Sequence, residues 1–550
     1  MGAPHDTAAA VLLMACLGVL LGAGLLAALV VAVRRLARDA AGVALLALLG
    51  LALAWLVGRD LTALPACGDE VVNLAETLIA LVSPVRMTRY PHPSGNFTLS
   101  AALFAVPIVG SAWAHGADIL STTAAWLLEN GLVQLIVARV LSSLAWVSLA
   151  GLCAWAVRRL TGDAWLGLVT AAAVIGPEVT YATALSPYSL GIGLGYAAVL
   201  VVLMGPSGQG LDPRRALAAG ALAGASLGVV YFGAMIVPWA LAAGLSLPGT
   251  RRRRVFVAFC GAASLAFVLV NTSLLVDLAG HLDMWGYRVR ELSSFDENAI
   301  AAAASPQKAS PLFYLRLLGG WMAWPAAAIG LAAGLALAAR RRDLRLAWLL
   351  ALPVLLLLTL SSVATRKEQF VLVALPGLAV AATAWLAPVL ARVPWPAARG
   401  AVRAGALAFF AAATLAQPLA PRLDARGTLL ASDPAQRLLA RVVAETPAGA
   451  RVLVDAPEVA LGNAAHQGLV APDLAEAAAA WSKAALGREL AFACGSGGDC
   501  WQGAGWLYQA SLLPLEPPRL PVGVRAEPGP VERWGVANLA AHRLLPAPPR

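Results

Sequence analysis

The chain has 550 residues, of which 60% are hydrophobic and 13% are charged, and its mean hydropathy is +0.75. Soluble domains carry about 25% charged residues, so this composition excludes an ordinary soluble enzyme and indicates a polytopic membrane protein. The formal net charge of +10 does not indicate a nucleic-acid partner. Most of the arginines stand in short clusters between apolar segments, where they orient a protein in the bilayer.

Apolar segments recur along most of the chain, and about 18 apolar residues suffice to cross the roughly 30 Å of hydrocarbon as a helix. Inside lipid every peptide group needs an internal partner, so the spans must be helical. We therefore predict an all-α polytopic membrane protein with about 12 transmembrane helices. The expected spans are 8–33, 40–57, 131–157, 164–185, 188–204, 215–230, 231–248, 255–276, 317–339, 346–363, 370–390 and 404–418.

Six basic clusters predict the orientation of these spans, because short loops rich in Arg and Lys stay on the cytoplasmic side. They are residues 34–39, 158–163, 212–215, 251–254 and 340–345, and the stretch that holds Arg392, Arg399 and Arg403. With these clusters inside, the amino terminus lies outside. Three long hydrophilic segments then also lie outside, namely 58–130, 277–314 and the tail from about 419.

Three further expectations follow from the pattern of apolar runs and charges. The run 216–248 must form a hairpin, because both of its flanks are basic. The run 97–113 is short and holds Pro107 and Gly110, and as a full span it would break the alternation, so an interfacial or re-entrant helix is expected. Residues 1–7 hold no Lys or Arg, and the positive cluster follows the first apolar run, which is not the pattern of a cleaved signal peptide.

The tail changes character, with prolines and short alternating runs such as RVLVDAP at 451–457. We expect residues 1–418 to form the transmembrane domain and 419–550 to form a small extracytoplasmic α/β or β-rich domain. Cys494 and Cys500 either form a disulfide or remain free thiols. Three other cysteines lie in apolar spans and are expected to be buried small residues, namely Cys16, Cys153 and Cys260.

An acid pair, Asp69 and Glu70, follows the second apolar segment and precedes a group of polar residues. One interpretation is structural, because acids are favoured in the first turn of a helix that starts at Val71. The other is catalytic: a carboxylate takes the proton of an attacking hydroxyl, while nearby cations bind an anionic leaving group such as a phosphate. The candidate binding residues in this loop are Arg86, Arg89, Tyr90 and His92.

Further candidates lie outside this loop. Arg139 stands in or at the edge of a span, where a charge is costly, so it has either a structural or a phosphate-facing role. Arg366 and Lys367 either bind phosphate or anchor a helix end at the interface. Asp277, His281 and Asp283 have a spacing that could bind a divalent ion, although a solvated helix start explains them better and no defined metal site is predicted.

The order of an apolar helix, Asp69-Glu70, an amphipathic stretch and then R-Y-x-H-P at 89–93 resembles the GT-C membrane glycosyltransferases. The similar branch contains the aminoarabinose lipid A transferase and the protein O-mannosyltransferases. Three more stretches are similar to landmarks of that family, and together they cover roughly residues 40–418. They are IVARVLSSLAWVSLAGLCAWAVRRLTGD at 136–163, FYLRLLGGWMAWPAAAIGLAAGLALAARRRD at 313–343 and TRKEQFVLVALPGLAVAATAWL at 365–386.

The resemblance implies a sugar donor linked to a polyprenyl phosphate and a catalytic base at the outer-facing acid, which is Asp69 here with Glu70 beside it. It implies an enzyme of the cytoplasmic membrane that transfers the sugar to an envelope lipid, glycan or protein, with no certain cofactor and a possible divalent metal ion. The sequence departs from the family at three places: His92-Pro93-Ser94, an additional first helix at 8–33, and 183–190, where Glu178 is the nearest acid.

Two other classes of protein remain open. A multi-span transporter or lipid flippase would also be helical, but it usually has polar residues at the bilayer midplane and a repeated half, neither of which is clear here. A non-catalytic envelope scaffold would use the tail as a binding module. In either case Asp69 would be dispensable.

Overall fold

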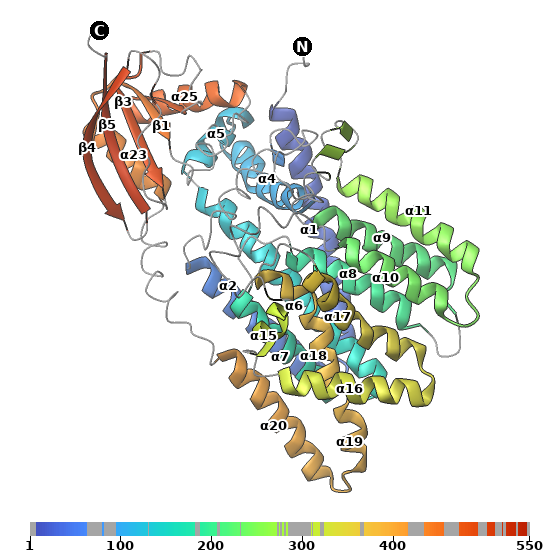
Figure 1. Cartoon of the computed structure of the whole chain (residues 1–550). Helices are drawn as coiled ribbons and strands as arrows, with labels where there is room; N and C mark the ends of the chain where they lie inside the picture. Colours follow the sequence, from blue (N-terminus) through green and yellow to red (C-terminus); the bar gives the residue numbers. More distant parts are fainter. Residues whose placement is uncertain are drawn as a thin grey trace.

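The computed structural model of the chain is a bundle of helices with a small sheet at its carboxyl-terminal end (Figure 1). The structure describes residues 7–62, 95–129, 131–181, 188–205, 210–230, 233–271, 310, 312–319, 324–362, 368–415, 434–455, 472–492, 503–511, 524–534 and 537–546. It also describes Thr77, Ala80, Leu81, Leu274, Leu278, Ala279, Leu282, Asp283, Gly286 and Leu520.

Helices dominate the described residues up to 415. In chain order they are α1 (Thr7–Leu36), α2 (Ala40–Thr62), α4 (Gly95–His115), α5 (Ile119–Glu129), α6 (Gly131–Thr161), α7 (Ala164–Tyr181), α8 (Tyr188–Leu203), α9 (Pro213–Val229), α10 (Gly233–Ser246), α11 (Arg252–Val270), α15 (Phe313–Gly319), α16 (Trp324–Arg341), α17 (Leu344–Ser362), the 3-10 helix η2 (Glu368–Val373), α18 (Leu375–Ala384), α19 (Leu386–Arg392) and α20 (Pro396–Leu415).

Among the described residues, length and composition allow seven spans to cross a membrane: six single helices, and α18 with α19 taken together as Leu375–Arg392. The bent pair α15 and α16 adds an eighth if it counts as one span. Three shorter apolar helices accompany them, at Ala164–Ile175, Ser189–Leu203 and Gly233–Ser246. An all-α polytopic protein with a small α/β unit at the carboxyl end is therefore confirmed as the fold class.

Two expected spans differ from a single regular helix. The span at 317–339 bends by 115° between α15 and α16, where Gly319 ends one helix and Pro325 stands in the first turn of the next. The span at 370–390 begins as the 3-10 helix η2, and α18 and α19 then follow as one candidate span, Leu375–Arg392. Pro376 lies in the first turn of α18, where a missing N–H costs nothing.

The segment that we expected to be interfacial forms α4, which includes Pro107. Its apolar part is 19 residues long and matches a membrane span in length and composition, so the interfacial placement stays a prediction. The helix packs closely along α1. A Cβ atom on Gly18 of α1 would lie 2.1 Å from the carbonyl oxygen of Ala102 in α4, so only glycine permits this approach.

The expected hairpin at 216–248 is present as α9 and α10, which pack on each other. Along α9, Gly220 and Gly224 form a glycine seam against α11. A Cβ atom on Gly220 would lie 2.2 Å from the carbonyl oxygen of Phe259, and one on Gly224 would lie 2.0 Å from that of Ala263. Small residues four apart let helix backbones approach closely, so the seam holds α11 against the bundle.

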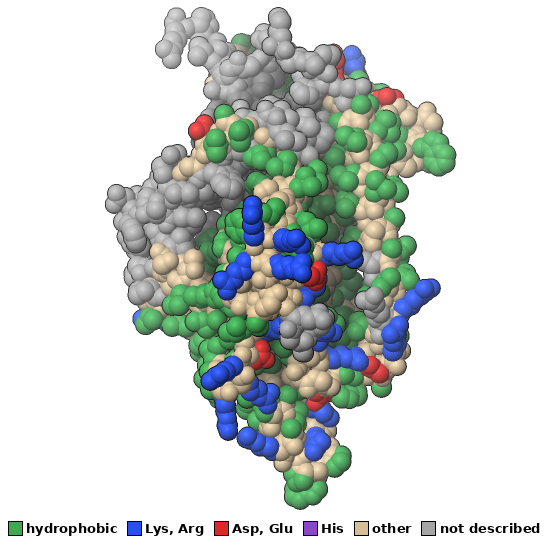
Figure 2. Space-filling model, turned by 90° about the vertical axis from the view of Figure 1, so that its right-hand side faces the viewer, with side chains coloured by type: hydrophobic (Ala, Val, Ile, Leu, Met, Phe, Trp, Pro, Cys, Tyr) green, Lys and Arg blue, Asp and Glu red, His purple; other side chains and the backbone are tan. Residues whose placement is uncertain are grey.

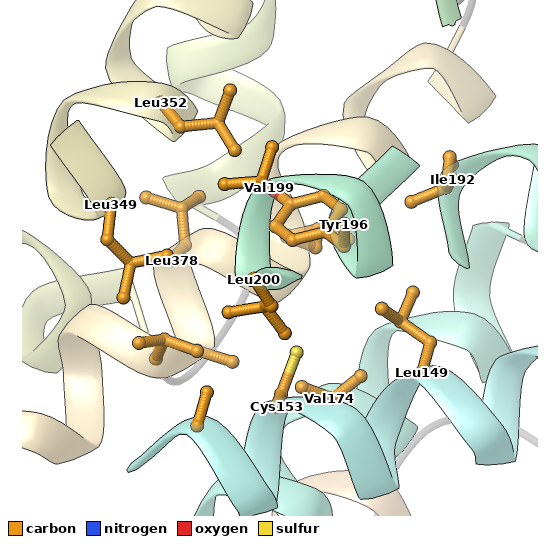
Figure 3. Close-up of a cluster of buried hydrophobic side chains, with 14 of the residues drawn as sticks. Leu149, Cys153, Val174, Ile192, Tyr196, Val199, Leu200, Leu349, Leu352 and Leu378 are labelled. Atoms are coloured by element: carbon orange, nitrogen blue, oxygen red, sulfur yellow. The ribbon is translucent and has the colours of Figure 1, made fainter. Parts of the chain in front are cut away.

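The core of the bundle lies where α6, α7, α8, α17 and α18 meet (Figure 3). Apolar side chains from these helices point toward one another there, and the small side chain of Cys153 packs among them. Of the three cysteines expected to be buried, Cys153 is buried, Cys260 is partly buried and Cys16 is exposed on α1, so the expectation is confirmed for Cys153 and wrong for Cys16. Hydropathy identifies a membrane helix but does not distinguish its lipid-facing side from its protein-facing side.

The basic clusters meet at one end of the bundle, and ion pairs between helices hold that end together. Arg158 Nη2 at the end of α6 lies 2.6 Å from Asp39 Oδ2, just before α2. The pKa of Asp39 is lowered, mainly because Arg158 donates to its carboxylate. Arg403 of α20 pairs with Asp163 just before α7. Figure 2 shows the Lys and Arg side chains gathered on the middle and lower part of the face opposite the sheet.

A five-stranded sheet with the strand order β2-β1-β3-β5-β4 forms the carboxyl-terminal unit. Strand β1 is parallel to β2 and β3, whereas β5 is antiparallel to β3 and β4. Helices α23 and α25 complete the unit. The bounds are α23 (Pro434–Glu445), β1 (Arg451–Asp455), α25 (Pro472–Leu486), β2 (Glu489–Phe492), β3 (Trp506–Ser511), β4 (Val524–Trp534) and β5 (Ala537–Pro546).

The carboxyl-terminal unit docks on the helices at the end away from the arginines. Leu474 and Ala478 of α25 share one buried apolar cluster with Leu127 and Leu128 of α5, and these two helices lie side by side in Figure 1. Thr7 N at the start of α1 donates to Asp473 Oδ2 at 3.2 Å. The expected domain boundary at 418/419, as well as Cys494 and Cys500, lies outside the described residues.

Candidate functional site

The helices bring three parts of the chain to the end of the bundle opposite the arginines. Helix α2 starts beside Asp39 at the basic end, and its 23 residues carry the chain about 34 Å to Thr62, before the segment with Asp69. Helix α17 starts at the basic end as well and finishes at Ser362, shortly before Arg366. Helix α6 runs the opposite way, with Arg158 in its last turn at the basic end. The last turns of α2 and α17 and the first turns of α6 therefore lie at the end of the bundle away from the arginines.

Arg139 is the one predicted site residue whose position the structure describes. It lies on α6, 19 positions before Arg158, which corresponds to about 28 Å of helix. That distance is close to the roughly 30 Å thickness of the hydrocarbon, so Arg139 lies near the opposite membrane boundary from the basic cluster. Its side chain is 1% exposed and does not lack a partner. Burying a charge without a partner is costly, so the guanidinium group of Arg139 is held by contacts inside the bundle at this end.

A buried tyrosine of α8 fixes the segment that follows Arg366 and Lys367 in the chain. The hydroxyl of Tyr196 donates to the carbonyl oxygen of Val373 at 2.9 Å and accepts from the N–H of Gly377 at 3.1 Å. These two bonds join the end of η2 to the first turn of α18. Figure 3 shows the ring of Tyr196 among apolar side chains, so no water competes for the two backbone groups.

A second polar contact, between the hydroxyls of Thr170 in α7 and Thr383 in α18, holds the other end of α18. The two oxygen atoms are 2.8 Å apart and buried. Together with Tyr196 this contact ties α18 to two neighbouring helices. The orientation of η2, which begins directly after Lys367, is thus set by packing and hydrogen bonds deep in the bundle.

Replacing Tyr196 with Phe should lower the free energy of unfolding by about 1–3 kcal/mol, because the change leaves a buried C=O and a buried N–H without a partner. Thermal unfolding of the purified protein in detergent measures this effect. Thr359→Val is the control, since that hydroxyl is exposed and donates within its own helix, to Leu355 O. Equal stability of the Tyr196→Phe variant and the wild type would contradict the role given to the hydroxyl.

The other predicted site residues lie outside the described residues: Asp69, Glu70, Arg86, Arg89, Tyr90, His92, Arg366 and Lys367. Their assignment stays a prediction. Of the expected cation ligands, Asp277 and His281 also lie outside, and Asp283 is exposed. Among the residues that the structure describes, no group of three or more His, Cys, Asp and Glu side chains could hold a metal ion.

Sequence reasoning missed Tyr196 and Thr170, and the reason is physical. A tyrosine in an apolar helix has the same pattern whether its hydroxyl reaches lipid headgroups or a buried backbone. One feature of the sequence could have indicated the tyrosine contact. Pro376 marks the start of a new helix, α18, and the backbone N–H and C=O groups at such a helix start need hydrogen-bond partners from elsewhere.

No protein-family model matches the chain, and no curated protein matches its sequence. Solved structures do match. One is ArnT from Cupriavidus metallidurans in the apo state, with 14% identity, 91% of this chain and 97% of that chain covered, and a TM-score of 0.49. Another is ArnT from the same organism bound to undecaprenyl phosphate, with 13% identity, 92% and 98% covered, and a TM-score of 0.54.

ArnT is a GT-C aminoarabinose transferase, and the likeness extends over nearly the whole of both chains. At this level of identity the likeness shows the fold. The chain therefore has the GT-C fold that the order of its motifs predicted.

Proposed function

We propose that this protein is a membrane glycosyltransferase that moves a sugar from a polyprenyl-phosphate donor to an envelope lipid, glycan or protein acceptor. The single observation that carries the proposal is the fold shared with ArnT bound to undecaprenyl phosphate over 92% of this chain. A lipid-linked donor also suits the architecture, because the prenyl chain of the donor can lie in the bilayer beside the bundle.

In the proposed mechanism Asp69 takes the proton of the acceptor hydroxyl as the hydroxyl oxygen attacks the anomeric carbon of the donor sugar. The bond from that carbon to the phosphate oxygen breaks, and the polyprenyl phosphate leaves with both electrons. Cationic side chains stabilise the charge that develops on the phosphate. The candidates for this role are Arg86, Arg89, His92, Arg139, Arg366 and Lys367, with Glu70 and Tyr90 beside the reacting groups.

The proposed location is the cytoplasmic membrane, with the reaction on its outer face. Clusters of Arg and Lys at one end of the bundle support this orientation, because such clusters stay on the cytoplasmic side. The carboxyl-terminal unit docks at the other end through α5 and α25 and would then be extracytoplasmic. Arg139 lies toward that same end of α6.

A donor-dependence assay tests the proposal. The purified full-length protein is incubated with radiolabelled polyprenyl-phosphate sugars and an envelope extract, and transfer of label to lipid, glycan and protein fractions is measured. We expect transfer from the polyprenyl donor and none from the matching nucleotide sugar. Transfer from the nucleotide sugar alone would overturn the donor class. No transfer, together with movement of the labelled lipid across a proteoliposome bilayer, would indicate a flippase.

A further inference from the structure

A run of four arginines stands at the start of α11, directly after the turn that follows α10. Arg251, Arg252, Arg253 and Arg254 are all exposed and line an open hollow of about 530 Å³. None of them forms an ion pair with an acidic residue in the part of the chain that the structure describes. Elsewhere at this end, Arg158 and Arg403 are paired with aspartates.

Helix starts at the basic end show the same contrast. The first N–H groups of α2, α7, α9 and α17 are bonded by the side chains of Asp39, Asp163, Asp212 and Asp343 respectively. Helix α11 starts at Arg252, and its N-cap residue, Arg251, makes no side-chain capping bond. The positive end of its dipole therefore adds to the charge of the four arginines instead of being offset by a carboxylate.

An exposed apolar surface continues directly from these arginines. Phe256 and Val257, one turn further along α11, are 48% and 64% exposed, and Leu265 and Leu269 are exposed as well. The opposite side of α11 is buried against the glycine seam of α9 through Val255 and Phe259. The first turn of α11 thus carries exposed cations, and the exposed side of the helix continues from them as an apolar surface.

We propose that this arginine turn binds the headgroup of an anionic phospholipid in the leaflet at the basic end of the bundle, with the acyl chains of the lipid along the exposed face of α11. Charge complementarity selects the headgroup, since a phosphodiester without a compensating amine matches these exposed guanidinium groups. The apolar continuation selects a lipid over a free phosphate. The inference is independent of the proposed sugar transfer.

Lipid titration of the full-length protein in detergent, read by native mass spectrometry, tests the inference. The probes are dioleoyl-phosphatidylglycerol and dioleoyl-phosphatidylcholine. The test variant is R252Q/R253Q/R254Q, and the matched control is R340Q/R341Q/R342Q, which removes three exposed arginines from the end of α16. R252K/R253K/R254K keeps the charge and checks that the substituted turn still folds.

We expect the wild type to prefer phosphatidylglycerol and the test variant to lose at least about tenfold in apparent affinity, because each cation at an anionic surface contributes roughly fivefold. The control and the lysine variant should stay within about threefold of the wild type. An equal loss in both glutamine variants would overturn the site in favour of diffuse attraction. Complete displacement of the lipid by an equal concentration of inorganic phosphate would overturn the lipid as occupant.

Discussion

Replacing Asp69 with Asn is expected to abolish sugar transfer while the protein remains folded and inserted. Removing a positioned general base costs typically 10²–10⁴-fold in rate, because the amide cannot accept the proton of the acceptor hydroxyl. The labelled-donor assay measures the loss at saturating donor. Binding of undecaprenyl phosphate to the variant should persist, because the predicted phosphate ligands are unchanged.

The control for this variant is Asp118→Asn, which also removes one negative charge at the end of the bundle away from the arginines. Asp118 is exposed and accepts from Ser121 N at 2.8 Å at the start of α5, a bond that an asparagine oxygen also accepts. Transfer by this control should equal that of the wild type. Undiminished transfer by the Asp69→Asn variant would remove the proposed mechanism, although not the fold or the lipid-binding turn.

Replacing Gly224 with Val should destabilise the bundle by about 3 kcal/mol, at the upper end of what overpacking usually costs. The new Cβ atom alone would lie 2.0 Å from the carbonyl oxygen of Ala263, so α9 and α11 must separate along the glycine seam. No side-chain rotation relieves this contact, because the obstructing atom belongs to the backbone. The melting temperature in detergent and the yield of monodisperse protein measure the effect.

Gly261→Val on α11 is the matched control for the seam. A Cβ atom at Gly261 meets nothing within 4 Å, and the substitution has the same intrinsic cost in a helix as the one at Gly224. The difference in stability between the two variants therefore isolates the contact between the helices. Equal melting temperatures would show that α9 and α11 are not as close as the structure places them.

The hydropathy and charge pattern alone determined the class of this protein, because the membrane leaves few choices. An apolar run of sufficient length must be a helix, and basic clusters mark one side. The hairpin of α9 and α10 and the gathering of arginines at one end follow from those two rules. The order of motifs was enough to predict the GT-C fold, although sequence comparison with curated proteins found no match.

The tertiary structure decided which faces of the helices meet, and hydropathy carries no information about that in a membrane. Lipid and protein interior are equally apolar, so Cys16 and Cys153 have the same sequence context, yet one is exposed and the other is buried. The breaks at Gly319 and around Pro376, and the tie from Tyr196 to Val373, also depend on contacts between residues far apart in the chain. Such contacts form only when the helices have packed together, and they position η2 and α18 in the bundle.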